Sequence, residues 1–218
     1  MKKIIFLLAV VISANVSMAQ SERYQKAMEQ NIAAIDTTRT VDGWRDLTNA
    51  FQRIADAEKT QWLPYYYSAM GHVMTGYMLA GGGMGGFADK TDPEADQAEA
   101  LLNKAEEMSK NNSEIYCVRK MIASLRLMAD PMNRYQVQGP LAQEALDKAK
   151  SLNPNNPRTY MLEAQDKFYT PEQYGGSKTE AKTLFEQSMK KFETFKPESN
   201  LHPQWGKNQV QYFLSQLK

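Results

Sequence analysis

The residues whose chemistry could support catalysis or metal binding are few. His72 and His202 are the two histidines and lie 130 positions apart, and Cys117 is the single cysteine. No paired Cys or His-x3-His spacing supplies the ligands that a zinc site requires. A Ser or Cys nucleophile would need one of the two histidines as its base, and no Gly-x-Ser-x-Gly motif is present. The sequence therefore predicts no catalytic residue, no metal ligand and no enzyme.

Two stretches resemble ligand-binding motifs but lack essential parts. GGGMGG at residues 81–86 has no strand before it and no Lys-Ser/Thr after it, which a phosphate-binding loop needs, so we interpret it as a flexible linker. FADKTDPEADQ at residues 87–97 lacks the central Gly and final Glu of a calcium loop. A pair of catalytic carboxylates stays open as an alternative, because spatial pairing cannot be read from the sequence. No cofactor is expected.

The segment with the most aromatic residues is WLPYYYSAMGHVMTGYM, residues 62–78. Aromatic side chains with one polar end bury a large area and still form hydrogen bonds, which suits partner recognition. Alternatively, this segment is the buried centre of the structure and His72 is a core or groove-edge residue. Both interpretations stay open at this stage.

The N-terminus has the pattern of an export signal. MKKIIFLLAVVISANVSMAQ combines two lysines, an apolar run over residues 4–12 and the small residues of Ser17-Met18-Ala19. This run is too short for a stable membrane anchor, so we expect residues 1–19 to be a cleaved signal peptide. The mature domain would then be residues 20–218, in the bacterial periplasm or secreted, with no stable membrane insertion.

Charge and cysteine content limit the function further. Without Lys2 and Lys3, the 26 basic residues fall to 24, against 25 acidic residues. No basic stripe stands out, so the sequence does not indicate nucleic-acid binding. A single cysteine allows no internal disulfide bond, so packing must hold the exported domain together.

A short pattern of a small, a bulky apolar and a second small residue occurs four times. It comprises Ala50-Ile54-Ala57, Ala98-Leu102-Ala105, Ala142-Leu146-Ala149 and Ala181-Phe185-Ser188. Offsets of four and three residues place the members on one helical face. After the second and third copies, an Asn-Asn pair and a Tyr recur at the same distances from the last alanine. The recurrence indicates repeated helical hairpins.

These stretches resemble tetratricopeptide repeats, whose second helix carries Ala, an aromatic or Leu, then Ala, before a Pro-Asn-Asn turn. The last small residues are 48, 44 and 39 positions apart, where the family repeat is 34. We assign the excess to Gly/Pro-rich insertions at residues 79–94, 128–140 and 169–180. The segments YTPEQYGG and FETFKPESNLHPQWGKNQ also resemble parts of secreted bacterial tetratricopeptide-like proteins of unassigned function.

The resemblance implies an all-α, tetratricopeptide-like solenoid of four irregular hairpins and a C-terminal capping helix. Asp92 is expected to cap a helix, with Pro93 and Pro140 at first helical positions. We expect four helix pairs and a final helix: 23–35 with 42–58, 64–79 with 93–109, 113–128 with 140–152, 157–168 with 177–195, and 203–217.

The resemblance also implies a concave groove lined by the first helix of each pair. The implied groove positions are Tyr66, Ala69, Val73, Glu114, Cys117, Met121, Arg158, Met161 and Gln165, with His72 as an alternative. Their mixed chemistry suits a peptide or protein segment. The candidate partner-binding residues are therefore Tyr66, His72, Glu114, Arg158 and Gln165.

The leading functional prediction is a non-catalytic adaptor that binds a protein or peptide partner in the bacterial cell envelope. One alternative is a small-molecule or glycan-binding protein, with Trp44, Trp62 and the tyrosine cluster stacking on sugar faces. Another alternative is a structural protein that associates with itself. The adaptor prediction depends on the repeat architecture and on the missing catalytic patterns, so it is partly an argument from fold.

Overall fold

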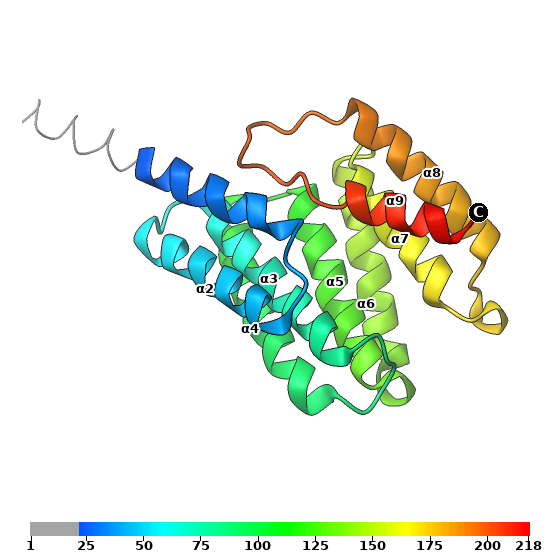
Figure 1. Ribbon diagram of the computed structural model, residues 1–218. Helices are drawn as coiled ribbons and strands as arrows, with labels where there is room; N and C mark the ends of the chain where they lie inside the picture. The colour runs from blue at the N-terminus through cyan, green and yellow to red at the C-terminus, as the bar shows by residue number, and fades with distance from the viewer. Residues whose placement is uncertain (1–21) are drawn as a thin grey trace, which may run out of the picture.

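The computed structural model describes residues 22–218, and the regular structure in this range is helical (Figure 1). The predicted all-α fold is confirmed, with successive helices packed side by side in a solenoid-like arrangement. The predicted signal peptide lies outside the described residues. The N-terminal helix is described over residues 22–35, and it is followed by α2 (Val41–Ala57), α3 (Trp62–Ala80), α4 (Ala88–Met108), α5 (Ser113–Ala129), α6 (Pro131–Leu152), α7 (Pro157–Tyr169), the short 3-10 helix η1 (Glu172–Tyr174), α8 (Lys178–Thr194) and α9 (Lys207–Gln216).

The helices pair in chain order. Helix α3 packs on α4, α5 on α6 and α7 on α8, which are the last three pairs expected from the sequence. Helices α3 and α5 also lie side by side, and α9 packs against α8. Among the described residues, no helix combines the length and apolarity that a membrane crossing needs. The finer assignment of this array to the tetratricopeptide class stays a prediction.

The recurring Asn-Asn pairs start helices. The Asn112 side chain accepts a hydrogen bond from the backbone N–H of Glu114, and Asn156 accepts one from Arg158. Both are N-caps, which satisfy backbone donors that a helix leaves unpaired at its first turn. Pro157 then occupies the first position of α7, where its missing N–H costs no intrahelical bond.

Two expected helix starts are wrong. Helix α4 begins at Ala88 and α6 at Pro131, so Pro93 and Pro140 lie inside helices instead of opening them. Asp92 does not cap a helix; its carboxylate accepts two hydrogen bonds from Arg134, both of 2.7 Å. These bonds lower the pKa of Asp92. Packing against α3 and α5 therefore extends both helices through prolines that the sequence suggested as boundaries.

The repeated small-bulky-small pattern is confirmed for three of its four copies. Every member of the copies in α4, α6 and α8 is buried. For the first copy, the prediction that these residues face a neighbouring helix is wrong, because Ala50 and Ile54 are half-buried and Ala57 is exposed. The buried stripe of α2 instead runs through Trp44, Leu47, Thr48, Phe51 and Ala55.

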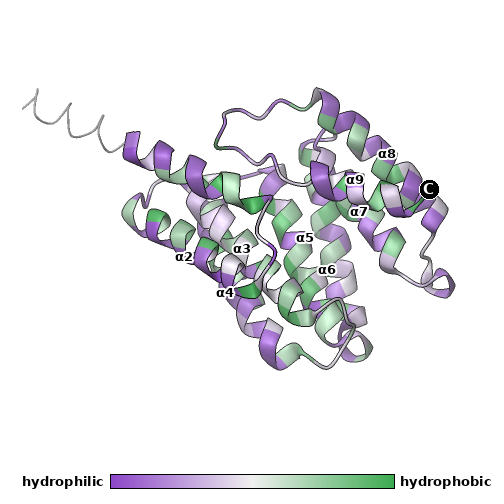
Figure 2. Cartoon of the chain, viewed as in Figure 1, coloured by the Kyte–Doolittle hydropathy of each residue, from purple (hydrophilic) through white to green (hydrophobic). Residues whose placement is uncertain are grey.

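The core is continuous from Met28 to Phe213, and α3 is buried on nearly every side. Tyr66 and Tyr67 are fully buried, and the helix faces rich in apolar residues turn toward one another (Figure 2). Of the two interpretations of this tyrosine-rich segment, the structure therefore supports the buried centre.

Gly71 permits the close contact between α3 and α2. A Cβ atom at this position would lie 2.2 Å from the Oγ1 atom of Thr48 and 3.4 Å from its Cα atom. We expect Gly71→Ala to destabilise the protein by about 1–3 kcal/mol, because overpacking forces the helices apart. Gly139→Ala is the control: nothing lies within 4 Å of its added Cβ, so about 0.5–1 kcal/mol of stabilisation is expected. Urea unfolding followed by circular dichroism checks both, and equal effects would contradict the assignment.

An irregular segment between α8 and α9 connects distant parts of the chain. Residues 195–206, which we call the C-terminal strap, run from the end of α8 toward the N-terminal helix (Figure 1). The Tyr67 hydroxyl donates a 2.9 Å hydrogen bond to the Leu201 carbonyl, and Asn200 donates one to Glu29. The strap therefore contacts both the N-terminal helix and the central helix α3.

Candidate functional site

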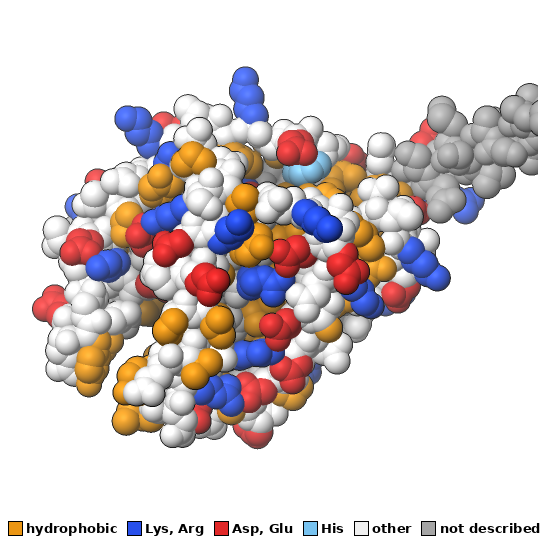
Figure 3. Space-filling model, turned by 180° about the vertical axis from the view of Figure 1, so that it is seen from behind, with side chains coloured by type: hydrophobic (Ala, Val, Ile, Leu, Met, Phe, Trp, Pro, Cys, Tyr) orange, Lys and Arg blue, Asp and Glu red, His pale blue; other side chains and the backbone are white. Residues whose placement is uncertain are grey.

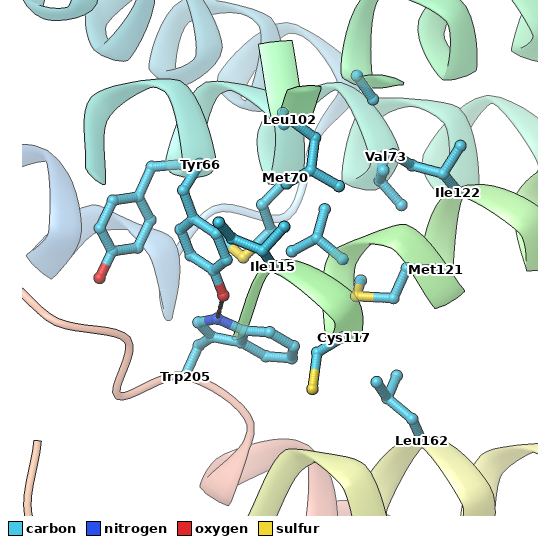
Figure 4. Close-up of a cluster of buried hydrophobic side chains, with 14 of the residues drawn as sticks. Tyr66, Met70, Val73, Leu102, Ile115, Cys117, Met121, Ile122, Leu162 and Trp205 are labelled. Atoms are coloured by element: carbon cyan, nitrogen blue, oxygen red, sulfur yellow. Dashed lines mark hydrogen bonds between the residues drawn. The ribbon is translucent and has the colours of Figure 1, made fainter. Parts of the chain in front are cut away.

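The groove implied by the repeat resemblance is filled by the C-terminal strap. Tyr66 and Arg158 have no exposed surface, and Glu114 is 12% exposed. Trp205 of the strap covers them: its indole Nε1 donates a 2.9 Å hydrogen bond to the Tyr66 hydroxyl (Figure 4). A partner could reach this groove only by displacing the strap.

Arg158 and Glu114 form a buried ion pair under the strap. The Arg158 Nη2 and Nε atoms lie 2.5 Å and 2.6 Å from the two Glu114 carboxylate oxygens. Arg158 Nη1 donates to the Trp205 carbonyl at 3.2 Å, and the guanidinium carbon lies 4.7 Å from the Phe195 ring centre. Two-point pairing and aromatic faces compensate for the cost of removing these charges from water.

Cys117 lies in the same buried region, where the Asn156 side-chain amide donates a 3.7 Å hydrogen bond to its Sγ atom (Figure 4). Its thiol is fully buried, and burial raises its pKa well above the ordinary value. Because the thiolate is the reactive form, this cysteine is expected to be inert in the folded protein. Burial likewise raises the pKa of Tyr66, which stays a neutral hydrogen-bonding group.

The other two candidate residues lie elsewhere. The His72 Nδ1 atom is 2.6 Å from Glu94 Oε2, so this side chain faces α4. Gln165 is half-buried on α7. The structure thus brings together Tyr66, Glu114 and Arg158 but neither of these two. Whether any of the five contacts a partner stays a prediction.

The aromatic residues suggested for glycan stacking do not form a surface platform. Trp44 is 4% exposed. Trp62 is half-buried and packs edge-on against Tyr66 and His202, with ring centres 5.5 Å and 5.7 Å away. Trp44 is therefore a core residue and Trp62 is only partly accessible, so the two do not present a shared stacking surface.

An open cleft of about 660 Å³ lies over α5, between α4 and α6. Ile122 and Ala123 of α5 form its buried floor, and Leu141 and Ala145 line it from α6. Its volume is within the range usual for small-molecule sites. The remaining lining residues are polar or ionic, with one tyrosine: Glu99, Tyr116, Arg119, Arg126, Gln138, Glu144, Asp147, Lys148 and Ser151.

Acidic residues of α4 hold the polar groups of the cleft in place. The Glu106 carboxylate accepts hydrogen bonds of 2.6 Å from the Tyr116 hydroxyl and 2.5 Å from Arg119 Nη2. The hydrogen bond to Glu106 is the main cause of a raised pKa at Tyr116, which therefore remains a donor. Arg126 pairs in the same way with Asp96 and Glu99, at 2.7 Å and 2.8 Å.

This arrangement suits an amphipathic small molecule. An apolar floor favours a flat hydrophobic body, while fixed cations near it orient acidic substituents. In the described part of the chain, no group of three or more His, Cys, Asp or Glu side chains is placed to hold a metal ion. Figure 3 shows the face of the molecule opposite to the one in Figure 1, and on this face basic and acidic side chains alternate around apolar ones.

Sequence reasoning missed this cleft. Arg119 and Arg126 are seven residues apart on α5, but solvent-exposed helix faces carry similar charges. The available signal was the apolar Ile122-Ala123 pair between the two arginines, on a helix that also carries residues of the groove implied by the repeat resemblance. Without knowing where α4 and α6 lie, that pair could not be told from ordinary core residues.

Comparison with known proteins finds a solved structure with a similar architecture. The sequence matches no protein-family model, and a search of the curated proteins finds no match. A solved structure, the HusA haemophore from Porphyromonas gingivalis, superposes on the chain with a TM-score of 0.76. The two sequences are 33% identical over 89% of this chain and 92% of the other.

This comparison corrects the leading functional prediction. The relative is a haemophore, a protein that carries the small molecule haem, and not a protein-interaction adaptor. The adaptor prediction is therefore wrong as the main function, and the small-molecule-binding alternative agrees better with the finding. With 33% identity over nearly the whole of both chains, the chain belongs to the family of the HusA haemophore.

Proposed function

We propose that this protein binds haem, and that the cleft between α4 and α6 is the binding site. The observation that carries the proposal is a cleft of about 660 Å³, with an apolar floor and two arginines, in a relative of a haemophore. Haem is flat and apolar over its ring and carries two carboxylates at one edge. The cleft offers complementary chemistry to both parts.

The apolar contacts would supply most of the affinity. Ile122 and Ala123 lie beneath the ring position, and Leu141 beside it is 47% exposed in the unliganded protein. Covering such surface releases about 25 cal/mol for each Å² removed from water. The paired arginines keep their geometry before the ligand arrives, which reduces the entropy lost on binding.

The test is a titration of residues 20–218 with haemin, followed through the Soret absorbance band. We expect saturable binding, and Leu141→Glu should weaken it at least about tenfold, because a carboxylate would replace an apolar contact. Val137→Glu is the matched control: Val137 is 58% exposed on the same helix, one turn earlier, and does not line the cleft. Absence of saturable binding would refute haem binding, and equal loss in both variants would move the site.

We also infer three less direct properties. The protein would act as a binder without chemical conversion, as the haemophore relationship suggests. It would be exported through the N-terminal signal pattern in residues 1–19. Its hairpins would be tetratricopeptide-like, supported by the asparagine caps and the buried small residues of α4, α6 and α8.

A further inference from the structure

The two cleft arginines flank the apolar floor. Arg119 and Arg126 are separated by seven residues of α5, which at 1.5 Å per residue is roughly 10 Å along the helix. Ile122 and Ala123 lie between them and form the floor of the cleft. A ligand lying on this floor therefore has a cation near each end of its contact with α5.

Both arginines retain unused hydrogen-bond donors. Arg119 donates through Nη2 to Asn103 and Glu106, and Arg126 through Nη2 to Asp96 and Glu99. Within residues 22–218, neither makes a hydrogen bond through Nε or Nη1, although a guanidinium has five N–H donors. The two side chains are 26% and 21% exposed, so a ligand in the cleft can reach them.

The charges of the opposite wall favour one ligand orientation. Glu144 and Asp147 line the cleft from α6, accompanied by Lys148. Neither acid forms an ion pair within residues 22–218, so both would repel a ligand carboxylate, whereas the acids of α4, which are Glu106, Asp96 and Glu99, are each neutralised by pairing with Arg119 or Arg126. Acidic groups of the ligand would therefore lie along α4 and α5, with its apolar body against Leu141 and Ala145.

We propose that Arg119 and Arg126 are specificity residues that select a flat apolar ligand carrying two carboxylates. Each guanidinium would donate hydrogen bonds to one carboxylate while its α4 partners keep it in place. This inference rests on the proposed function and refines it: the cleft distinguishes a diacid from a ligand with the same ring and neutral side groups.

The test compares haemin with its dimethyl ester, in which the same ring carries no free carboxylate, under conditions where both are monomeric. The wild-type protein should bind the diacid at least about tenfold more tightly, since charged hydrogen bonds are the stronger ones. Arg119→Gln and Arg126→Gln should each reduce this preference, and the double variant should abolish it while the ester still binds. Arg45→Gln on α2, whose partner is Asp42 and which does not line the cleft, is the control and should keep the preference.

The outcomes separate the two proposals. Equal binding of diacid and ester by the wild-type protein would overturn the arginine inference and leave haem binding intact. Binding of neither compound would overturn both. The wild-type comparison needs no substitution, so it decides the question even if a variant folds poorly, and circular dichroism checks the helix content of each variant.

Discussion

Replacing Glu114 with alanine is expected to lower the free energy of unfolding by about 3–5 kcal/mol, because it leaves a buried guanidinium without its counter-charge. Arg158 has no exposed surface, and two of its three side-chain hydrogen bonds go to the Glu114 carboxylate, which is its counter-charge. The remaining contacts of Arg158, with the Trp205 carbonyl and the aromatic rings, cannot neutralise it. Chemical denaturation followed by circular dichroism measures the loss.

A double variant separates the buried charge from lost packing. Glu114→Leu with Arg158→Met should recover much of the stability, since apolar residues of similar volume often replace a buried ion pair at little cost. Arg45→Gln provides the surface control, because its 3.7 Å contact with Asp42 is largely exposed and such pairs contribute about 0–1 kcal/mol. A loss at Glu114→Ala no larger than at Arg45→Gln would contradict the buried-charge argument.

Replacing Trp205 with alanine is expected to lower the free energy of unfolding by about 3–5 kcal/mol, the usual range for a buried tryptophan. Trp205 is 6% exposed and covers Tyr66 and the Arg158–Glu114 pair. Its removal should loosen the C-terminal strap before the helices unfold. Cys117, which is buried in the same region, then reports the change, because thiol-labelling reagents react only when this side chain is uncovered.

We expect Trp205→Ala to label at Cys117 in native buffer much faster than the wild-type protein does. Tyr212→Ala is the control, because Tyr212 is an aromatic residue of α9 that is 60% exposed and should change neither stability nor labelling. Fast labelling of the wild-type protein would show that the strap does not protect the thiol. Slow labelling of Trp205→Ala would show that the helices alone protect the thiol.

The helices could largely be predicted from the sequence because their signals are local. Asn112, Asn156 and Ser177 cap the helices that begin after them, and small residues at helical spacing mark three of the buried faces. The helix starts expected at Pro93 and Pro140 were wrong because tertiary packing continues a helix through a proline that local preference treats as a boundary. Local signals therefore located the hairpins but misplaced two helix starts.

The candidate sites depend on contacts between residues far apart in the chain, and the sequence could not supply these. Tyr66, Glu114 and Arg158 do come together, yet nothing in their spacing indicated that residues 195–206 would cover them. The cleft needs α4, α5 and α6 in place before Arg119 and Arg126 face the same space. The same three-dimensional information was missing for the glycan interpretation of Trp44, which is a core residue.

The C-terminal strap has a consequence for how the protein unfolds and how it could have evolved. In an open helical array each unit touches only its neighbours, so the ends can fray and units can be added by duplication. Here the Leu201 carbonyl is bonded to Tyr67, and Asn208 of α9 donates a 3.2 Å hydrogen bond to Asp36. These bonds connect the strap and the last helix to α3 and to the end of the N-terminal helix, so the first and last helices of the array are tied together. Such an array should unfold as one cooperative unit. Inserting another hairpin would require a longer strap to restore these contacts.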